Sequence, residues 1–194
     1  MIHPISLFQV MRLASLVSVV AFLSVSAHAD LSTIDLTRLK EMSVELHQKG
    51  ASTFVSLHPA CTGGETWGLV AVAIKHGNDA GLEIGIKAMP YLDAGCGESM
   101  VISLGQAIKH NAAAFLKYLS QRASFGPGPE EICGAIVPND SKDYVPEDDI
   151  NDLSARLKAL SKVKNKELQL LNETCSKHIR KQITSLRTGS AKGK

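Results

Sequence analysis

Apolar residues recur every three or four positions along most of the chain beyond residue 30, with polar residues between them. This spacing places the apolar side chains on one face of an α-helix. The chain lacks long alternating runs of β-branched residues, which would indicate strands. The pattern therefore predicts an all-α domain of six to seven helices. The apolar stripes are Leu36, Leu39, Met42 and Leu46; Trp67, Val70, Ala71 and Ile74; Leu82, Ile86 and Met89; Val101, Leu104 and Ile108; Phe115, Leu116 and Leu119; Ile150, Leu153, Leu157 and Leu160; and Leu168, Leu171, Cys175, Ile179 and Leu186.

A four-residue motif appears twice at an offset of 34 residues. Residues 73–76 and 107–110 both read Ala-Ile-Lys-His, and Leu82 aligns with Leu116. Such an offset is typical of helical hairpins that stack to bury their apolar faces. Because there is no third copy, we expect two stacked hairpins inside one globular domain rather than a longer array.

The first 29 residues have the pattern of an export signal. Arg12 precedes an almost uninterrupted apolar stretch at residues 13–25, and Ala27-His28-Ala29 follows it. A positive charge, a short apolar stretch and an Ala-x-Ala end are typical of a secretory signal peptide. We expect cleavage after Ala29, a periplasmic or secreted product, and no transmembrane segment after cleavage. An uncleaved anchor is the alternative, but the stretch is shorter than the roughly 20 residues that span a membrane.

Composition divides the rest of the chain into a domain and a tail. We expect a single α-helical domain at residues 30–187, which includes a proline- and glycine-rich acidic loop at 126–145. Residues 188–194 are predicted to form a basic disordered tail. The loop has few apolar residues to bury, so a covalent link would be needed to hold it.

Four cysteines follow the predicted cleavage site: Cys61, Cys96, Cys133 and Cys175. In an exported chain, this even number favours two disulfides. A metal site is the alternative, but no Cys-x-x-Cys pair provides its usual spacing. Cys61 and Cys96 each precede one copy of the repeated motif, so stacked hairpins would bring them together. We therefore predict the pairs Cys61–Cys96 and, by elimination, Cys133–Cys175, which would tie the loop to the last helix.

Charge is unevenly distributed, although the whole chain carries only +2. Eight acids and one base occupy residues 126–152, whereas eleven bases and two acids occupy residues 153–194. The small net charge argues against a protein that mainly binds nucleic acid. Lys177, Arg180 and Lys181 are candidate partner-binding residues, toward an acidic protein face or anionic envelope lipids. The alternative is a solvated helix face whose charge is balanced by the acidic loop.

Two short acidic turns hold the candidate catalytic residues Asp79, Glu83, Asp93 and Glu98. Paired carboxylates act as acid and base when a fold holds them at a suitable separation. Acidic residues in these positions are also what helix N-termini require. We favour the capping role, because nothing in the sequence brings the two turns to one cleft.

The remaining candidate residues are Trp67 and the histidines. An exposed Trp67 would contact a partner, although its place on an apolar stripe favours the core. His76 and His110 occupy equivalent positions of the repeat. The histidines lack the His-Glu-x-x-His or His-x-His spacing of a metal site, and no phosphate loop or dinucleotide motif occurs. We expect neither a metal nor a cofactor.

These observations favour a non-enzymatic protein that binds another protein in the cell envelope. A small disulfide-linked helical scaffold with separated charges suits an immunity-type inhibitor of a toxin or cell-wall-degrading effector. One alternative is a small envelope hydrolase that uses the carboxylates of the acidic turns. Another is a structural or chaperone-like factor that acts through the basic last helix.

Overall fold

The computed structural model describes residues 31–59, 65–137 and 144–191 of the 194-residue chain. Every regular element in these ranges is helical, which confirms the predicted all-α fold. The α-helices are α1 (Thr33–Lys49), α2 (Ala51–Leu57), α3 (Glu65–Lys75), α4 (Asp79–Ala88), α5 (Ala94–Ser120), α6 (Pro129–Cys133), α7 (Pro146–Leu160) and α8 (Gln169–Ala191). Two 3-10 helices, η1 (Met89–Tyr91) and η2 (Lys166–Leu168), follow α4 and precede α8.

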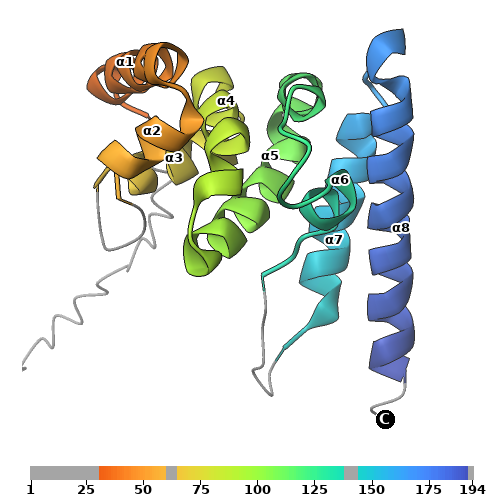
Figure 1. Cartoon of the computed structure of the whole chain (residues 1–194). Coiled ribbons are helices and arrows are strands. Elements are labelled where there is room, and N and C mark those ends of the chain that lie inside the picture. The colour runs from red at the N-terminus through yellow and green to blue at the C-terminus, as the bar shows by residue number, and fades with distance from the viewer. Residues whose placement is uncertain (1–30, 60–64, 138–143, 192–194) are drawn as a thin grey trace, which may run out of the picture.

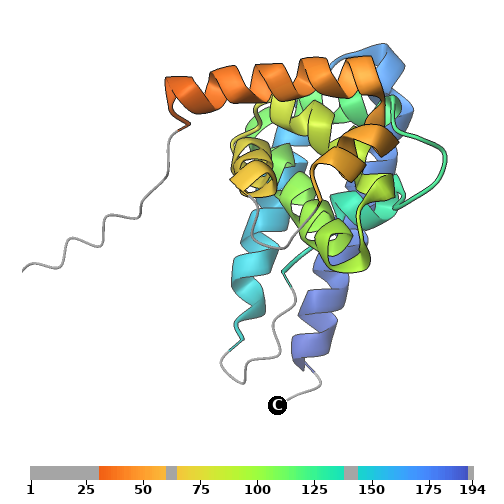
Figure 2. The same cartoon turned by 60° about the vertical axis from the view of Figure 1, so that its left-hand side comes forward.

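The helices are arranged in chain order from one side of the molecule to the other (Figure 1). Helices α1–α4 form one side, α5 runs through the middle, and α6–α8 form the other side. Figure 2 shows α1 lying across the top of the molecule, while α7 and α8 run along its length. One apolar core, to which all eight α-helices contribute, joins the two sides into a compact body.

Two short helices appear where the apolar periodicity predicts none. Helix α2 has seven residues and buries Phe54, and α6 has five residues inside the predicted loop at 126–145. Both are too short to display a helical stripe, so the described residues contain eight α-helices rather than six or seven. Helix α8 also continues to Ala191, past residue 188, where the composition predicts the start of a tail.

Helix α5 contains a break at the position where the repeated motif predicts a turn. Asn111 has φ −148° and ψ 68°, which lie outside the helical region. Its side chain donates a hydrogen bond to the Gly77 carbonyl oxygen (Nδ2–O 2.9 Å) and accepts one from the Ala114 amide (3.2 Å). The first copy of the repeat forms the α3–α4 hairpin, and the second consists of two helices that meet at this break within α5. Both copies therefore have a helix on either side of equivalent positions, Gly77 and Asn111, as the repeat predicts.

The two copies of the repeat touch at equivalent positions, because Gly77 and Asn111 are 34 residues apart. Gly77 has φ +69°, and a Cβ at this position would lie 2.7 Å from the Asn111 Cβ. A side chain larger than hydrogen is excluded both by this contact and by the backbone conformation. The stacking of the two copies thus depends on glycine in one and on a hydrogen-bonding side chain in the other.

Replacing Asn111 with alanine should lower the free energy of unfolding by about 1–2 kcal/mol. The change removes the cap on the second half of α5 and the donor to the Gly77 carbonyl. Urea unfolding followed by circular dichroism measures the loss. Asn151→Ala, at an exposed position of α7, is the matched control and should change stability by less than about 0.5 kcal/mol. Equal stability of the two variants would contradict the capping role.

A disulfide between Cys133 and Cys175 links α6 to α8, which confirms this predicted pair. The two Cα atoms lie 5.2 Å apart, and both cysteines are fully buried. Cys96 is buried at the start of α5. Cys61 lies outside the described residues, so the pair Cys61–Cys96 stays a prediction.

Arg156 of α7 is a buried charged side chain, with only 1% of its surface exposed. Its guanidinium donates hydrogen bonds to the carbonyl oxygens of Cys133 (3.2 Å) and Ala135 (2.7 Å). It also pairs with Asp152, with Nε 2.8 Å from Oδ2. Gly105 of α5 lies against it, since a Cβ there would be 2.8 Å from Arg156 Nη1. Arg156 thus joins the end of α6 to α7 beneath α5.

No helix in the described ranges combines the length and apolar character needed to cross a membrane. The Cys133–Cys175 disulfide is compatible with an exported protein. The predicted export signal at residues 1–29 lies outside these ranges and stays a prediction.

Candidate functional site

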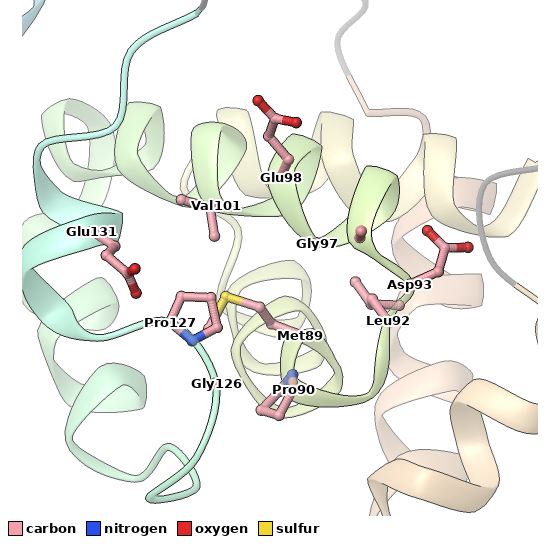
Figure 3. A pocket seen from close by; sticks show the side chains of 11 residues that line it. Met89, Pro90, Leu92, Asp93, Gly97, Glu98, Val101, Gly126, Pro127 and Glu131 are labelled. Carbon is pink, nitrogen blue, oxygen red and sulfur yellow. The ribbon is translucent and has the colours of Figure 1, made fainter.

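A groove of about 330 Å³ opens between η1, the first turns of α5 and the segment that leads into α6 (Figure 3). Its apolar walls are formed by Met89, Pro90, Leu92, Val101 and Pro127. Three carboxylates also line it, those of Asp93, Glu98 and Glu131. We name the surface formed by these eight residues, together with Ala94, Gly97 and Gly126, the α5–α6 groove.

Proline, glycine and a helix cap shape the groove. Pro90 lies in η1, directly after α4. Gly126 has φ +87°, and a Cβ there would lie 3.3 Å from the Pro90 Cβ, so the loop after α5 passes close to η1. The Asp93 side chain accepts a hydrogen bond from the Cys96 amide (2.9 Å) and caps α5. These local contacts position the two sides of the groove before any ligand arrives.

Two exposed aromatic side chains adjoin the groove in the chain. Tyr91, between Pro90 and Leu92, is 40% exposed, and Phe125, next to Gly126, is 50% exposed. Their rings meet edge to face, with centroids 5.4 Å apart and planes at 86°. Aromatic side chains beside a groove are favoured anchors of protein–protein contacts. Neither residue lies on a helical stripe, so apolar periodicity does not single out this pair.

Glu131 is the carboxylate that points toward the middle of the groove in Figure 3. It lies in the first turn of α6, where its Oε2 accepts a hydrogen bond from the Gly128 amide (2.7 Å). The carboxylates of Asp93 and Glu98 point away from the middle. The residues that line the groove include no lysine, arginine or histidine, so its charge is negative.

The four candidate catalytic carboxylates are divided between two places. Asp93 and Glu98 share the α5–α6 groove, whereas Asp79 and Glu83 lie on α4 and do not line it. Asp79 accepts a hydrogen bond from Asn111 at the break of α5 (3.2 Å). Asp93 is occupied as the cap of α5, as the capping interpretation predicts. This arrangement does not give the facing pair of carboxylates that hydrolysis of a glycosidic bond requires.

Glu83 links α4 to α1. Its side chain is 13% exposed, accepts hydrogen bonds from Ser43 and Lys87 (2.8 Å each), and lies 2.9 Å from His47 Nε2. Burial by itself raises the pKa of Glu83, but the hydrogen bonds and the charges of Lys87 and His47 outweigh it, and the pKa lies below its usual value. Glu83 is therefore ionised at neutral pH and is poorly suited to act as a general acid.

Trp67 is a core residue, with 6% of its surface exposed. Its indole nitrogen donates a hydrogen bond to the His58 carbonyl oxygen (2.8 Å), and its ring meets Phe54 edge to face at 6.1 Å. The interpretation of Trp67 as an exposed partner contact does not fit this placement, because its ring is covered by the protein itself.

Lys177, Arg180 and Lys181 are exposed on α8. None of the ion pairs in the described part of the chain includes them. Helices α7 and α8 run in opposite directions, so the acidic first turn of α7, residues 147–149, stands at the same end as the C-terminal half of α8 (Figure 1). The role of Lys177, Arg180 and Lys181 in partner binding stays a prediction. The acidic turn of α7 supports the alternative, in which the positive charge of α8 is balanced within the protein.

Two further cavities, of about 400 and 480 Å³, flank the break of α5. Lys109, Lys162 and Lys164 line the smaller one. Asp79, Lys117 and Glu167 line the larger one. Both are larger than the α5–α6 groove, but neither adjoins a pair of exposed aromatic rings. We therefore take the α5–α6 groove as the candidate binding site.

No cluster of three or more His, Cys, Asp or Glu side chains in the described ranges could hold a metal ion. Of the two equivalent histidines of the repeat, His110 has a pKa below its usual value. Burial lowers the pKa of His110, and the charges of Lys109 and His76 lower it further. His110 is therefore a neutral side chain at pH 7.

No protein-family model, curated protein or solved structure matches this chain. Its class is therefore defined by its own fold and surface. That class is an all-α protein with a buried disulfide and an exposed apolar groove of negative charge.

Proposed function

We propose that the mature chain is an exported, non-enzymatic protein that binds another protein through the α5–α6 groove. Within this class we favour an immunity-type inhibitor, which blocks a toxin or a cell-wall-degrading effector in the periplasm. The observation that carries the proposal is the exposed Tyr91–Phe125 pair, whose chain neighbours Pro90 and Gly126 line an apolar groove.

The energetics of the groove favour a macromolecular partner. Burial of apolar surface contributes about 25 cal/mol per Å², so a partner that covers the two rings and the apolar walls gains free energy. The close contact between Gly126 and Pro90 and the cap at Asp93 hold the groove in place. A preformed surface loses little conformational entropy when a partner docks.

The carboxylates support binding more than hydrolysis. Asp93 caps a helix, Glu83 is ionised among hydrogen-bond donors, and Glu98 points away from the groove. The predicted export signal and the even number of cysteines after it support the envelope location.

A photo-crosslinking residue tests the proposal in the organism that encodes the protein. With p-benzoylphenylalanine in place of Phe125, we expect one discrete covalent adduct with a single envelope protein, identified by mass spectrometry. The matched control carries the same residue in place of Leu57, which is 51% exposed on α2 and does not line the groove. An equal adduct from position 57 would contradict the proposal.

Filling the groove should strongly reduce the amount of this adduct. Gly97 lines the groove on α5, and a Cβ there meets no atom within 4 Å, so Gly97→Leu adds bulk without disturbing the core. We expect roughly tenfold less adduct, equivalent to about 1.4 kcal/mol of binding free energy. Gly68→Leu, at an equally open and exposed helical glycine of α3, is the control and should leave the adduct unchanged. An undiminished adduct in Gly97→Leu would refute the groove as the binding site.

The basic residues of α8 give a second control. Lys177, Arg180 and Lys181 lie outside the groove lining, so their replacement by alanine should preserve the adduct from position 125. Loss of that adduct would assign the contact to α8 and contradict the proposed site.

A further inference from the structure

We propose that the smaller of the two cavities at the break of α5 binds the phosphate group of a phosphate monoester. We name it the lysine cavity, after Lys109, Lys162 and Lys164, which line it. It is separate from the α5–α6 groove, since the two share none of their described lining residues. The inference follows from the charge of the lysine cavity, from the segments that build it and from its size.

The lining of the lysine cavity is basic. Three lysines and two asparagines line it, and no aspartate or glutamate is among its described lining residues. The larger cavity at the same break differs, because Asp79 and Glu167 line it together with Lys117. Cations without acids between them create a positive potential that attracts an anion.

The acid that pairs with this lining does not cancel its charge. Asp152 lies 2.7 Å from Lys109 Nζ, but it also pairs with the buried Arg156 (Oδ2–Nη2 2.6 Å). One carboxylate cannot neutralise two cations, so positive charge remains. Lys162 and Lys164 take part in none of the ion pairs in the described part of the chain. Their charges are therefore free to meet a ligand.

Two segments that are distant in sequence build the lysine cavity. Lys109 and residues 111–113 belong to the break of α5, whereas Lys162 and Lys164 lie in the connection between α7 and η2. The packing of α7 on α5 brings the two segments together. Lys164 Nζ donates one hydrogen bond to the Ser161 carbonyl oxygen (3.2 Å). An ammonium group has three donors, so this contact orients Lys164 and leaves two donors for a ligand.

The chemistry of the lining favours phosphate over a carboxylate. A phosphate monoester carries almost two negative charges at pH 7 and has three strong acceptor oxygens. Several separate ammonium groups can bind it at once, and lysine is a common phosphate ligand. The volume of about 400 Å³ is roughly thirteen times the share of one water in the liquid. This space holds the phosphate and part of the group that carries it.

His110 also lines the lysine cavity and can report on an anion there. Burial lowers the pKa of His110, the charges of Lys109 and His76 lower it further, and the charge of Asp152 raises it. An anion bound beside the imidazole would stabilise its protonated form, so binding should raise the pKa of His110.

Titration of the exported protein with inorganic phosphate tests the inference. In two-dimensional NMR at constant ionic strength, phosphate should produce saturable shifts of the Ala113 and Val163 amide signals. It should also raise the pKa of His110. Acetate, which carries a single charge, should bind roughly tenfold more weakly. Equal affinities for phosphate and acetate, or a pKa of His110 that phosphate leaves unchanged, would overturn the inference.

Removal of two lysines should weaken phosphate binding. The double variant Lys162→Gln with Lys164→Gln is expected to lower the affinity roughly tenfold. The matched control, Lys158→Gln with Lys166→Gln, removes the same charge from exposed positions of the same region that do not line the cavity. Because salt screens these more distant charges, the control should lower the affinity by about twofold at most. Equal losses in the two double variants would contradict a defined site.

A negative charge inside the lysine cavity should block it. Ala113 lines the cavity at an exposed position just after the break of α5. A carboxylate in the first turn of a helix is stabilising, so Ala113→Glu should fold normally. We expect it to bind phosphate at least roughly tenfold more weakly than Ala113→Gln, which adds similar bulk without charge. Equal affinities of these two variants would overturn the role of charge.

Vesicles distinguish a soluble ligand from a lipid headgroup. The soluble probe is glycerol 1-phosphate, and the vesicles contain phosphatidic acid and phosphatidylcholine. Sedimentation with the vesicles that is lost only in Lys162→Gln with Lys164→Gln would assign the phosphate to a lipid. Binding of glycerol 1-phosphate without such sedimentation would assign it to a soluble ligand, and failure of both probes would overturn the inference. None of these measurements depends on the adduct from position 125, so the proposed function is tested separately.

Discussion

Replacing Arg156 with methionine is expected to lower the free energy of unfolding by roughly 3–5 kcal/mol. Methionine retains an apolar stem but lacks the donors that reach the carbonyl oxygens of Cys133 and Ala135. Because the guanidinium is 1% exposed, water has little access to replace those donors. Buried acceptors without a partner are a main source of large destabilisation.

The same substitution should change how stability depends on pH, through Asp152. Burial raises the pKa of Asp152, but the charge of Arg156 and the hydrogen bonds from Lys109 and Arg156 outweigh it, so the pKa lies below its usual value. A carboxyl with a lowered pKa stabilises the fold above its unfolded pKa of about 3.9 and loses that contribution as the pH falls toward its folded pKa. Below about pH 4 the wild type should therefore lose more stability than Arg156→Met does.

Guanidinium chloride unfolding at pH 7 and pH 3 measures both effects. Lys158→Met, at an exposed cation of the same helix, is the matched control and should lie within about 0.5 kcal/mol of the wild type. If the free energy of unfolding of Arg156→Met also lay within about 1 kcal/mol of the wild-type value, the hydrogen bonds of the buried guanidinium would not stabilise the contact between α6 and α7.

Removal of the disulfide between Cys133 and Cys175 is expected to cost about 4 kcal/mol. The bond closes a loop with a sequence separation of 42, and opening it returns conformational entropy to the unfolded chain. Both cysteines are replaced by alanine together, since a single change would leave a reactive thiol. The short helix α6 should then lose its link to α8, although Ile132 still packs in the core.

Thermal and urea unfolding without reductant measure this loss. Treatment of the Cys133→Ala, Cys175→Ala variant with reductant should lower stability again, because the predicted Cys61–Cys96 bond would still be present. Peptide mapping of this variant without reduction should show Cys61 linked to Cys96. Unchanged stability of the double variant would contradict the role of the α6–α8 link.

Periodicity predicts the helices of this protein well where they are long. The stripe at Ile150, Leu153 and Leu160 is buried in α7, and Cys175 and Ile179 are buried in α8. Helices α2 and α6 are missed, because five to seven residues contain at most two turns. The repeat correctly places a turn at Gly77 and a break between two helices at the equivalent position, Asn111.

The candidate site is harder to predict from the sequence than the helices are. The sequence singles out Asp93 and Glu98 as candidate catalytic carboxylates, and both residues line the groove. There they lie next to an apolar surface and do not form a catalytic pair. Tyr91 and Phe125 have no periodic signal, and each lies in a short connection next to proline or glycine. In the sequence, Arg156 does not differ from the other bases of the C-terminal segment. Its burial depends on neighbours that are distant in sequence, so only the structure shows it.

The sequence by itself determined the all-α fold, because helical spacing is a local pattern. It also predicted the Cys133–Cys175 bond, by elimination from the expected stacking of the repeat in an exported chain. Only the tertiary structure decided where the binding surface lies. The groove forms because residues 89–101 and 126–131 meet across the turn that follows α5. Such a meeting depends on long-range packing and on the close approach of Gly126 to Pro90. Neither is encoded in the spacing of any one segment.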